Sequence, residues 1–202
     1  LYNFILECKK LDSIPEWRAN ISQLIVGYLS KYAVDPNSID PNNPTYVTRI
    51  PTYDIFNIII MGTPGVGKSF TADIIGKVLK YSGLLTKGDR HDIKKPDIVG
   101  SYTGQTAPKV YKEFTECLGK VIFIDEAYSI AGAKDETKGT YNEFGQESLD
   151  ALTDYTSEHI GFSAFVAAGY EYEMNTQFLE VNIGLPRRFP TQLILKRYSL
   201  HS

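Results

Sequence analysis

Residues 62–69 read Gly62-Thr63-Pro64-Gly65-Val66-Gly67-Lys68-Ser69, between an apolar segment, 55–61, and a segment, 70–81, whose apolar residues recur at helical spacing. The glycines let backbone N–H groups turn inward around an anion, and the helix that follows offers an N-terminus whose positive dipole end favours phosphate. Lys68 can reach the β- and γ-phosphates of a nucleotide, and the Ser69 hydroxyl can ligate Mg²⁺. The sequence therefore predicts a phosphate-binding P-loop, with residues Gly62 to Phe70 in contact with the nucleotide.

The rest of the chain alternates between apolar runs and helical patterns. Strands are predicted at 55–61, 121–124, 162–168 and 192–196, with at most a weak strand before Pro96, and the helices between them at 70–81, 106–118, 144–156 and 171–180. This alternation favours a parallel sheet that is covered by helices on both faces. The predicted fold class is α/β, a P-loop NTPase with a five-stranded parallel sheet sandwiched by helices.

A second motif follows the run 121–124, which is short and continuously apolar, as expected of a strand buried on both faces. Asp125 and Glu126 come directly after it, at the carboxyl end of the strand, where ligands bind in open α/β sheets. Downstream of a complete P-loop, this pair is predicted to be a Walker B motif. Asp125 would hold Mg²⁺, directly or through water, and Glu126 would orient and polarise the water that attacks the γ-phosphate of ATP.

Composition excludes several classes of protein. The net charge is −3 and the basic residues are dispersed, so nothing favours a nucleic-acid or acidic-membrane partner. Cys8 and Cys117 lie far apart and have no partner at metal-ligand spacing, which argues against a zinc site or a disulfide framework and favours an intracellular, cytoplasmic setting. No apolar run approaches the roughly 20 residues that a membrane span needs.

The first 53 residues are expected to form a helical extension and a linker. Ser13 to Glu16 has the spacing of a capping box, and an amphipathic helix is predicted from there to about Ser30. Residues 33–53 contain four prolines among Asn and Asp and are predicted to be an irregular connection. The predicted organisation is thus an extension, 1–53, followed by an ATPase core, 54–202.

Several linked motifs then resemble one family. They are the runs 123–129 (FIDEAYS), 99–109 (VGSYTGQTAPK), 145–147 (GQE), 168–170 (AGY) and 182–189 (NIGLPRRF). In this order they resemble an AAA+ ATPase, and more narrowly the branch that contains the CbbX-type, or red-type, Rubisco activases and the sporulation proteins of the SpoVK type. The resemblance covers roughly residues 57–198.

The resemblance implies a ring, usually a homohexamer, with ATP and Mg²⁺ bound between neighbouring subunits. It implies that Arg188 is the arginine finger that acts on the neighbour's ATP, and an arginine suits this task because its planar charged fork matches phosphate oxygens. Arg187 stands where the family usually has serine, so the sequence leaves open which of the two arginines reaches the phosphate. Tyr170 is nearest to the sensor-1 position of the family, and packing is the alternative role for it.

The resemblance also places Tyr102, Thr103 and Gly104 in a pore loop, where an aromatic residue grips a polypeptide that passes through the ring. A protein substrate and a chaperone-like remodelling activity are therefore expected. Two alternatives remain: an AAA+ motor that acts on nucleic acid, and an assembly module that switches its oligomeric state with nucleotide. The small helical lid of the family, with its sensor-2 arginine, would follow residue 202 and is expected to be missing.

Overall fold

The computed structural model describes residues 6–7, 9–10, 56–82, 84–100, 102, 104–132 and 141–196. Five strands form one sheet: β1 (Ile58–Gly62), β2 (Arg90–Ile93), β3 (Val121–Ile124), β4 (Ala164–Gly169) and β5 (Thr191–Leu195). Their order across the sheet is β2-β3-β4-β1-β5, and every pair of neighbours is parallel. The predicted five-stranded parallel sheet is confirmed, and the weak strand before Pro96 is β2.

The helices connect successive strands. They are α3 (Lys68–Tyr81), α4 (Lys95–Ile98), α5 (Thr106–Glu116), α6 (Tyr128–Ala131), α7 (Glu143–Glu158), α8 (Glu171–Glu173), the π-helix η3 (Met174–Leu179) and α9 (Leu185–Arg188). The helix predicted at 171–180 is thus a single α-helical turn that continues as a π-helix. Three of the short helices were not predicted, because four residues are too few to show a helical period.

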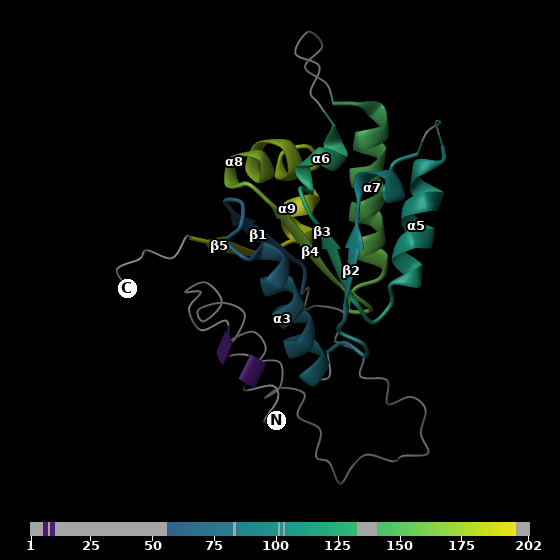
Figure 1. Cartoon of the computed structure of the whole chain (residues 1–202). Helices are drawn as coiled ribbons and strands as arrows, with labels where there is room; N and C mark the ends of the chain where they lie inside the picture. The colour runs from purple at the N-terminus through teal and green to yellow at the C-terminus, as the bar shows by residue number, and fades with distance from the viewer. Residues whose placement is uncertain are drawn as a thin grey trace, which may run out of the picture.

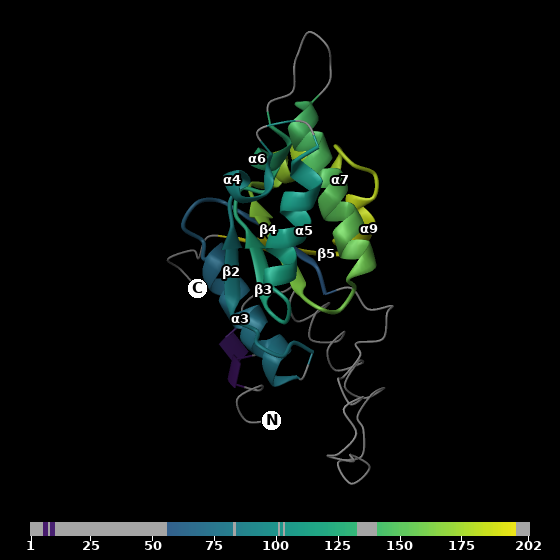
Figure 2. The ribbon, with the colours of Figure 1, turned by 90° about the vertical axis from the view of Figure 1, so that its right-hand side faces the viewer.

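Helices cover both faces of the sheet, as predicted. Side chains alternate along β1, so that Ile58 and Ile60 pack in the same core cluster as residues of α3, whereas Ile59 and Met61 pack with residues of α5 and α7. Figures 1 and 2 show α3 on one side of the sheet and α7 on the other. All residues of β3 and β4 are buried, as expected of central strands in a sheet with two covered faces.

The helix predicted from Ser13 to Ser30 and the connection predicted at 33–53 lie outside the described residues. Within the described part of the chain, no helix is long and apolar enough to cross a membrane. The topology brings the carboxyl ends of β1, β3 and β4 to one edge of the sheet, since all three strands are parallel. The P-loop follows β1, Asp125 follows β3 and Tyr170 follows β4, so the three segments meet at this edge.

Candidate nucleotide site

The P-loop joins β1 to α3. Gly67 is the N-cap of α3 and has φ 94°, a left-handed conformation that glycine adopts without steric cost. No side chain caps this end of the helix, and no acidic residue lies in its first turn. The first N–H groups of a 14-residue helix are therefore open to an anion, in the electrostatic setting that favours phosphate.

Lys68 lies half-buried at the start of α3, with its ammonium group facing the loop. Its Nζ donates to the carbonyl oxygen of Gly62 at 2.9 Å and to that of Thr63 at 3.2 Å. The same atom lies 5.2 Å from the centre of the Tyr170 ring, which is within the range of a cation–π interaction. The charge of Lys68 is thus held by three weak partners, and a phosphate could replace them.

Asp125 and Glu126 form an exposed turn after β3. The Glu126 backbone has φ 48°, the only positive φ among the described residues other than glycine, and its N–H donates to Asp125 Oδ1 at 3.0 Å. Two further backbone bonds hold the turn: Ser129 N–H donates to Glu126 O at 2.7 Å, and Ala127 N–H donates to Ala168 O of β4 at 3.0 Å. The turn is therefore fixed both by its own backbone and by the neighbouring strand.

A cavity of about 390 Å³ unites these segments. Its lining residues come from the P-loop, from the turn after β3 and from the end of β4: Pro64, Gly65, Gly67, Lys68, Ser69, Phe70, Asp125, Glu126, Gly169 and Tyr170. The structure thus brings Lys68, Ser69, Asp125 and Glu126 to a single hollow. Of the residues predicted to contact the nucleotide, Gly62, Thr63 and Val66 do not line it. Phe70, the last of the predicted contact residues, leaves 63% of its surface exposed there.

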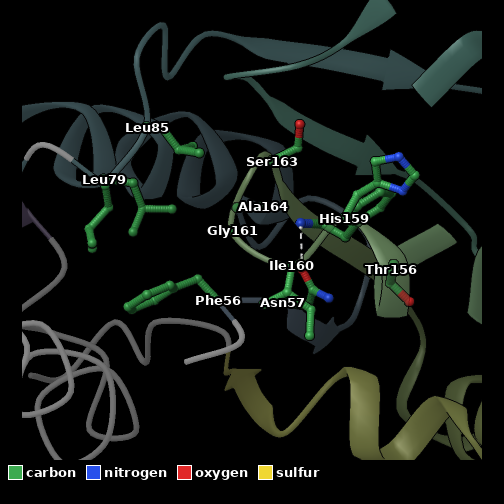
Figure 3. A pocket seen from close by; sticks show the side chains of 12 residues that line it. Phe56, Asn57, Leu79, Leu85, Thr156, His159, Ile160, Gly161, Ser163 and Ala164 are labelled. Carbon is green, nitrogen blue, oxygen red and sulfur yellow. Dashed lines mark hydrogen bonds between the residues drawn. The ribbon is translucent and has the colours of Figure 1, made fainter. Parts of the chain in front are cut away.

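A second hollow lies at the other end of the strands, near Asn57, which precedes β1, and Ala164, which begins β4 (Figure 3). Its volume is about 10 Å³, enough for one water molecule at most. Asn57 is buried there, and its Oδ1 accepts the N–H of Phe165 at 3.0 Å, the bond drawn in Figure 3. This hollow is far too small for a nucleotide. It is a small gap in the packing at this end of the sheet.

The sequence profile of the AAA family, the ATPase family associated with various cellular activities, matches residues 58–187. The chain belongs to the AAA family of ATPases. The matched segment of this AAA domain begins at β1 and ends within α9, so it includes every strand but β5.

Curated relatives of the AAA domain include bacterial sporulation and secretion proteins. Stage V sporulation protein K of Bacillus subtilis is 35% identical over 144 residues, which are 71% of this chain and 42% of that protein. ESX-2 secretion system protein EccA2 of Mycobacterium tuberculosis is 32% identical, and ESX-1 secretion system protein EccA1 of Mycolicibacterium smegmatis is 34% identical, each over 143 residues. These cover 71% of this chain and 23% and 24% of the two relatives. The chain thus spans less than half the length of the relatives it matches.

Of the other predicted site residues of the AAA domain, those that the structure describes do not line the cavity. Tyr102 is 72% exposed in the connection between α4 and α5, Gly104 beside it has φ 79°, and Thr103 lies outside the described residues. Arg188 ends α9 half-buried, and its Nε donates to Ser157 Oγ of α7 at 2.6 Å, whereas Arg187 is exposed. Neither arginine lines the cavity of its own chain.

Two residues near the site of the AAA domain, Tyr128 and Arg90, were not predicted to take part in it. Burial, together with the neighbouring negative charge of Glu126, raises the pKa of the Tyr128 hydroxyl to about 12. Arg90 of β2 donates from Nη1 to the carbonyl oxygen of Ser69 at 2.8 Å and so ties the first turn of α3 to the edge of the sheet. The only sequence signal for Tyr128 is its position two residues after Glu126. No feature of the sequence indicates that Arg90 lies near the site.

Proposed function

We propose that this AAA domain binds ATP with Mg²⁺, hydrolyses it, and uses the reaction to remodel a protein substrate. The observation that carries the proposal is the single cavity that joins Lys68 and Ser69 of the P-loop to Asp125 and Glu126 of the Walker B motif. A glycine-rich turn that binds no ligand is not expected to face two carboxylates across an open cavity.

The residues of the cavity fit a nucleotide triphosphate with magnesium. The open N–H groups of the α3 N-terminus and the Lys68 ammonium suit phosphate oxygens, and the hydroxyl of Ser69 and the carboxylate of Asp125 are the oxygen ligands that Mg²⁺ prefers. The described residues contain no cluster of three His, Cys, Asp or Glu side chains that could hold a metal without other ligands. Mg²⁺ would therefore arrive with the phosphates and keep several waters.

The proposed chemistry is phosphoryl transfer to water, in which positioning and charge neutralisation supply most of the acceleration. Bound Mg²⁺ would neutralise charge that develops on the phosphate oxygens. Lys68 would bind the β- and γ-phosphates after leaving its carbonyl partners. Glu126 would accept a hydrogen bond from the attacking water and polarise it, a role that suits its exposed carboxylate at the edge of the cavity.

We propose that the reaction site is completed by the next subunit of a homo-oligomeric ring, because the domain belongs to a family whose members generally oligomerise. Arg188 is the proposed finger, with Arg187 as the alternative. Arg187 is exposed, whereas Arg188 would have to give up its bond to Ser157 to reach outward. The two possibilities are separated by measuring Arg187→Ala and Arg188→Ala in the assembled full-length protein. The substitution that removes the finger should abolish turnover and leave the affinity for ATP unchanged.

The central test is Glu126→Gln in the full-length protein. The amide keeps the size of the side chain and removes its basicity, so ATP affinity should stay within about twofold while turnover falls by about 10²- to 10⁴-fold. Glu180→Gln, an exposed substitution outside the cavity, is the matched control and should leave both values unchanged. Equal turnover by Glu126→Gln and the wild type would exclude Glu126 as the group that activates water.

Remodelling of a protein substrate is supported by the exposed Tyr102 and by the acidic net charge of −3. Tyr102→Ala should lower the amount of client protein unfolded per ATP hydrolysed, because an exposed aromatic ring supplies most of the contact area of its loop. Tyr172→Ala is the matched control, since Tyr172 is also 72% exposed. Strong stimulation of hydrolysis by DNA or RNA would instead favour a nucleic-acid motor.

A further inference from the structure

Arg90 of β2 contacts both of the segments that carry the proposed Mg²⁺ ligands. Its Nη1 donates to the carbonyl oxygen of Ser69, in the first turn of α3, at 2.8 Å and lies 3.4 Å from Oδ1 of Asp73, one turn further along the helix. Its guanidinium carbon lies 5.1 Å from the centre of the Phe123 ring in β3. One side chain thus joins the start of the P-loop helix to the strand that leads to Asp125.

The guanidinium of Arg90 is held in one orientation by Asp92 of the same strand. Arg90 Nε lies 2.7 Å from Asp92 Oδ1, and Nη2 donates to Asp92 Oδ2 at 3.3 Å. Two parallel contacts of this kind fix the plane of a guanidinium, and its remaining nitrogen is still free to reach a third partner. The direction in which Nη1 points at Ser69 is therefore set by β2.

The charge of Arg90 is balanced where it lies. It stands beside the first turn of α3, where the positive end of the helix dipole disfavours a cation. Asp73 and Asp92 contact the same guanidinium and offset this repulsion. Arg90 therefore adds little net positive charge near the phosphate-binding loop, and its influence on the site comes from the geometry of its contacts.

The two proposed Mg²⁺ ligands, Ser69 and Asp125, belong to separate segments and both line the cavity. Mg²⁺ demands near-ideal octahedral geometry, so its affinity depends on how the ligands are placed relative to one another. Further along α3, residues such as Ile74 pack with Phe123 in one apolar cluster. Apolar packing is not directional, whereas the hydrogen bond from Arg90 is, and it is made at the end of α3 where Ser69 lies.

We propose that Arg90 is a positioning residue that sets the first turn of α3 against β3, so that Ser69 and Asp125 are placed to receive the Mg²⁺ that accompanies ATP. Arg90 does not line the cavity and acts through the backbone of Ser69 and the ring of Phe123. The inference rests on the proposed ATPase function and adds to it a residue of the outer strand β2.

The test measures how much Mg²⁺ tightens nucleotide binding, without turnover. In the full-length protein, the Kd of a non-hydrolysable ATP analogue is measured in EDTA and in excess Mg²⁺, and the first value divided by the second is the Mg²⁺ ratio. Arg90→Met keeps a long apolar side chain over Phe123 and removes every donor, so the Mg²⁺ ratio should fall about fivefold, at the lower end of couplings between sites. The Kd in EDTA should stay within about twofold, because Lys68 and the helix N–H groups bind phosphate without Arg90.

Two further substitutions separate geometry from charge. Arg90→Lys keeps the charge but cannot form the parallel contacts with Asp92, so its Mg²⁺ ratio should also fall. Lys120→Met is the matched control, because it removes a cation that lies 3.6 Å from Asp89 Oδ2, just before β3 and β2, and it should leave the ratio unchanged. A wild-type ratio in Arg90→Lys, or an equal loss in Lys120→Met, would overturn the positioning role.

A purely structural role of Arg90 predicts a different result. It would lower Tm and leave the Mg²⁺ ratio of Arg90→Met at the wild-type value, an outcome that contradicts the inference. Asp92→Asn loosens the guanidinium from a carboxylate that is 52% exposed, so it leaves the core intact and should lower the ratio in the same direction. In a Ser69→Ala background, Arg90→Met should change the ratio much less than in the wild type, and an equal loss in both backgrounds would show that Arg90 does not act through Ser69.

These measurements distinguish failure of the inference from failure of the proposed function. If Glu126→Gln loses turnover and Arg90→Met keeps the wild-type Mg²⁺ ratio, the role of Arg90 is wrong and the ATPase function stands. If the wild type binds no ATP analogue, or binds it equally well in EDTA and in Mg²⁺, the proposed Mg²⁺-dependent function is wrong and the role of Arg90 is wrong with it.

Discussion

Asn57 offers a sensitive test of how the sheet is held together at the end opposite the nucleotide site. Its side chain is 4% exposed, and its Oδ1 accepts the N–H of Phe165 in β4 at 3.0 Å, one position before the β1–β4 ladder begins at Ile58 and Val166. Asn57→Ala removes the acceptor and leaves a buried N–H unpaired. Because an unsatisfied buried donor costs about 1–3 kcal/mol, we expect the free energy of unfolding to fall by about 2 kcal/mol.

Thermal unfolding followed by circular dichroism measures this loss. For a chain of this size, about 2 kcal/mol corresponds to a fall in Tm of about 4–8 °C, and the amide of Phe165 should exchange its hydrogen faster than in the wild type. Asn175→Ala is the matched control, because Asn175 is exposed and its amide donates only to the carbonyl of Glu171 on the surface. Equal changes in Tm for the two variants, or unchanged exchange at Phe165, would refute the assignment of the buried bond.

Two further predictions concern packing near the site and the buried thiol. Gly169→Ala should lower the free energy of unfolding, measured by urea titration, by about 1–3 kcal/mol, because the added Cβ would lie 2.7 Å from Sδ of the buried Met174. Unchanged stability would contradict this close packing. Burial raises the pKa of Cys117 to about 11, so in a Cys8→Ser protein iodoacetamide at pH 8 should react with the native thiol far more slowly than with the unfolded one. Since the folded pKa is the higher one, the contribution of this thiol to stability is complete below the unfolded pKa of about 9 and is lost as pH rises through 11.

The sequence was sufficient for the elements with strong periodic or motif signals. Val121–Ile124 is the strand that its continuous apolar run predicts, and α7 extends the predicted helix 144–156 by only one residue at its start and two at its end. The P-loop and the Walker B pair were each predicted to follow a strand of one parallel sheet and to act on the same ATP and Mg²⁺. The structure places them around the same cavity.

Features that depend on contacts between distant segments could not be predicted in this way. The ring of Tyr128 lies 6.0 Å from that of Tyr170 because β3 and β4 are neighbours in the sheet, and the order of strands cannot be read from local patterns. The π-helical turns of η3 need one more residue per hydrogen-bonded ring than an α-helix, a difference that the spacing of Met174 and Phe178 does not reveal. The bond of Arg188 to Ser157 likewise joins residues that no motif relates.

The left-handed backbone at Glu126 has a consequence for any attempt to engineer this domain. A residue with a side chain costs roughly 1–2 kcal/mol in that conformation, and glycine would relieve most of the cost. A selection for heat resistance alone would therefore favour glycine at position 126 and would remove the carboxylate in the same step. Libraries of stabilised variants should for this reason be screened for ATP turnover as well as for Tm, since the residue that this backbone conformation favours differs from the one proposed to activate water.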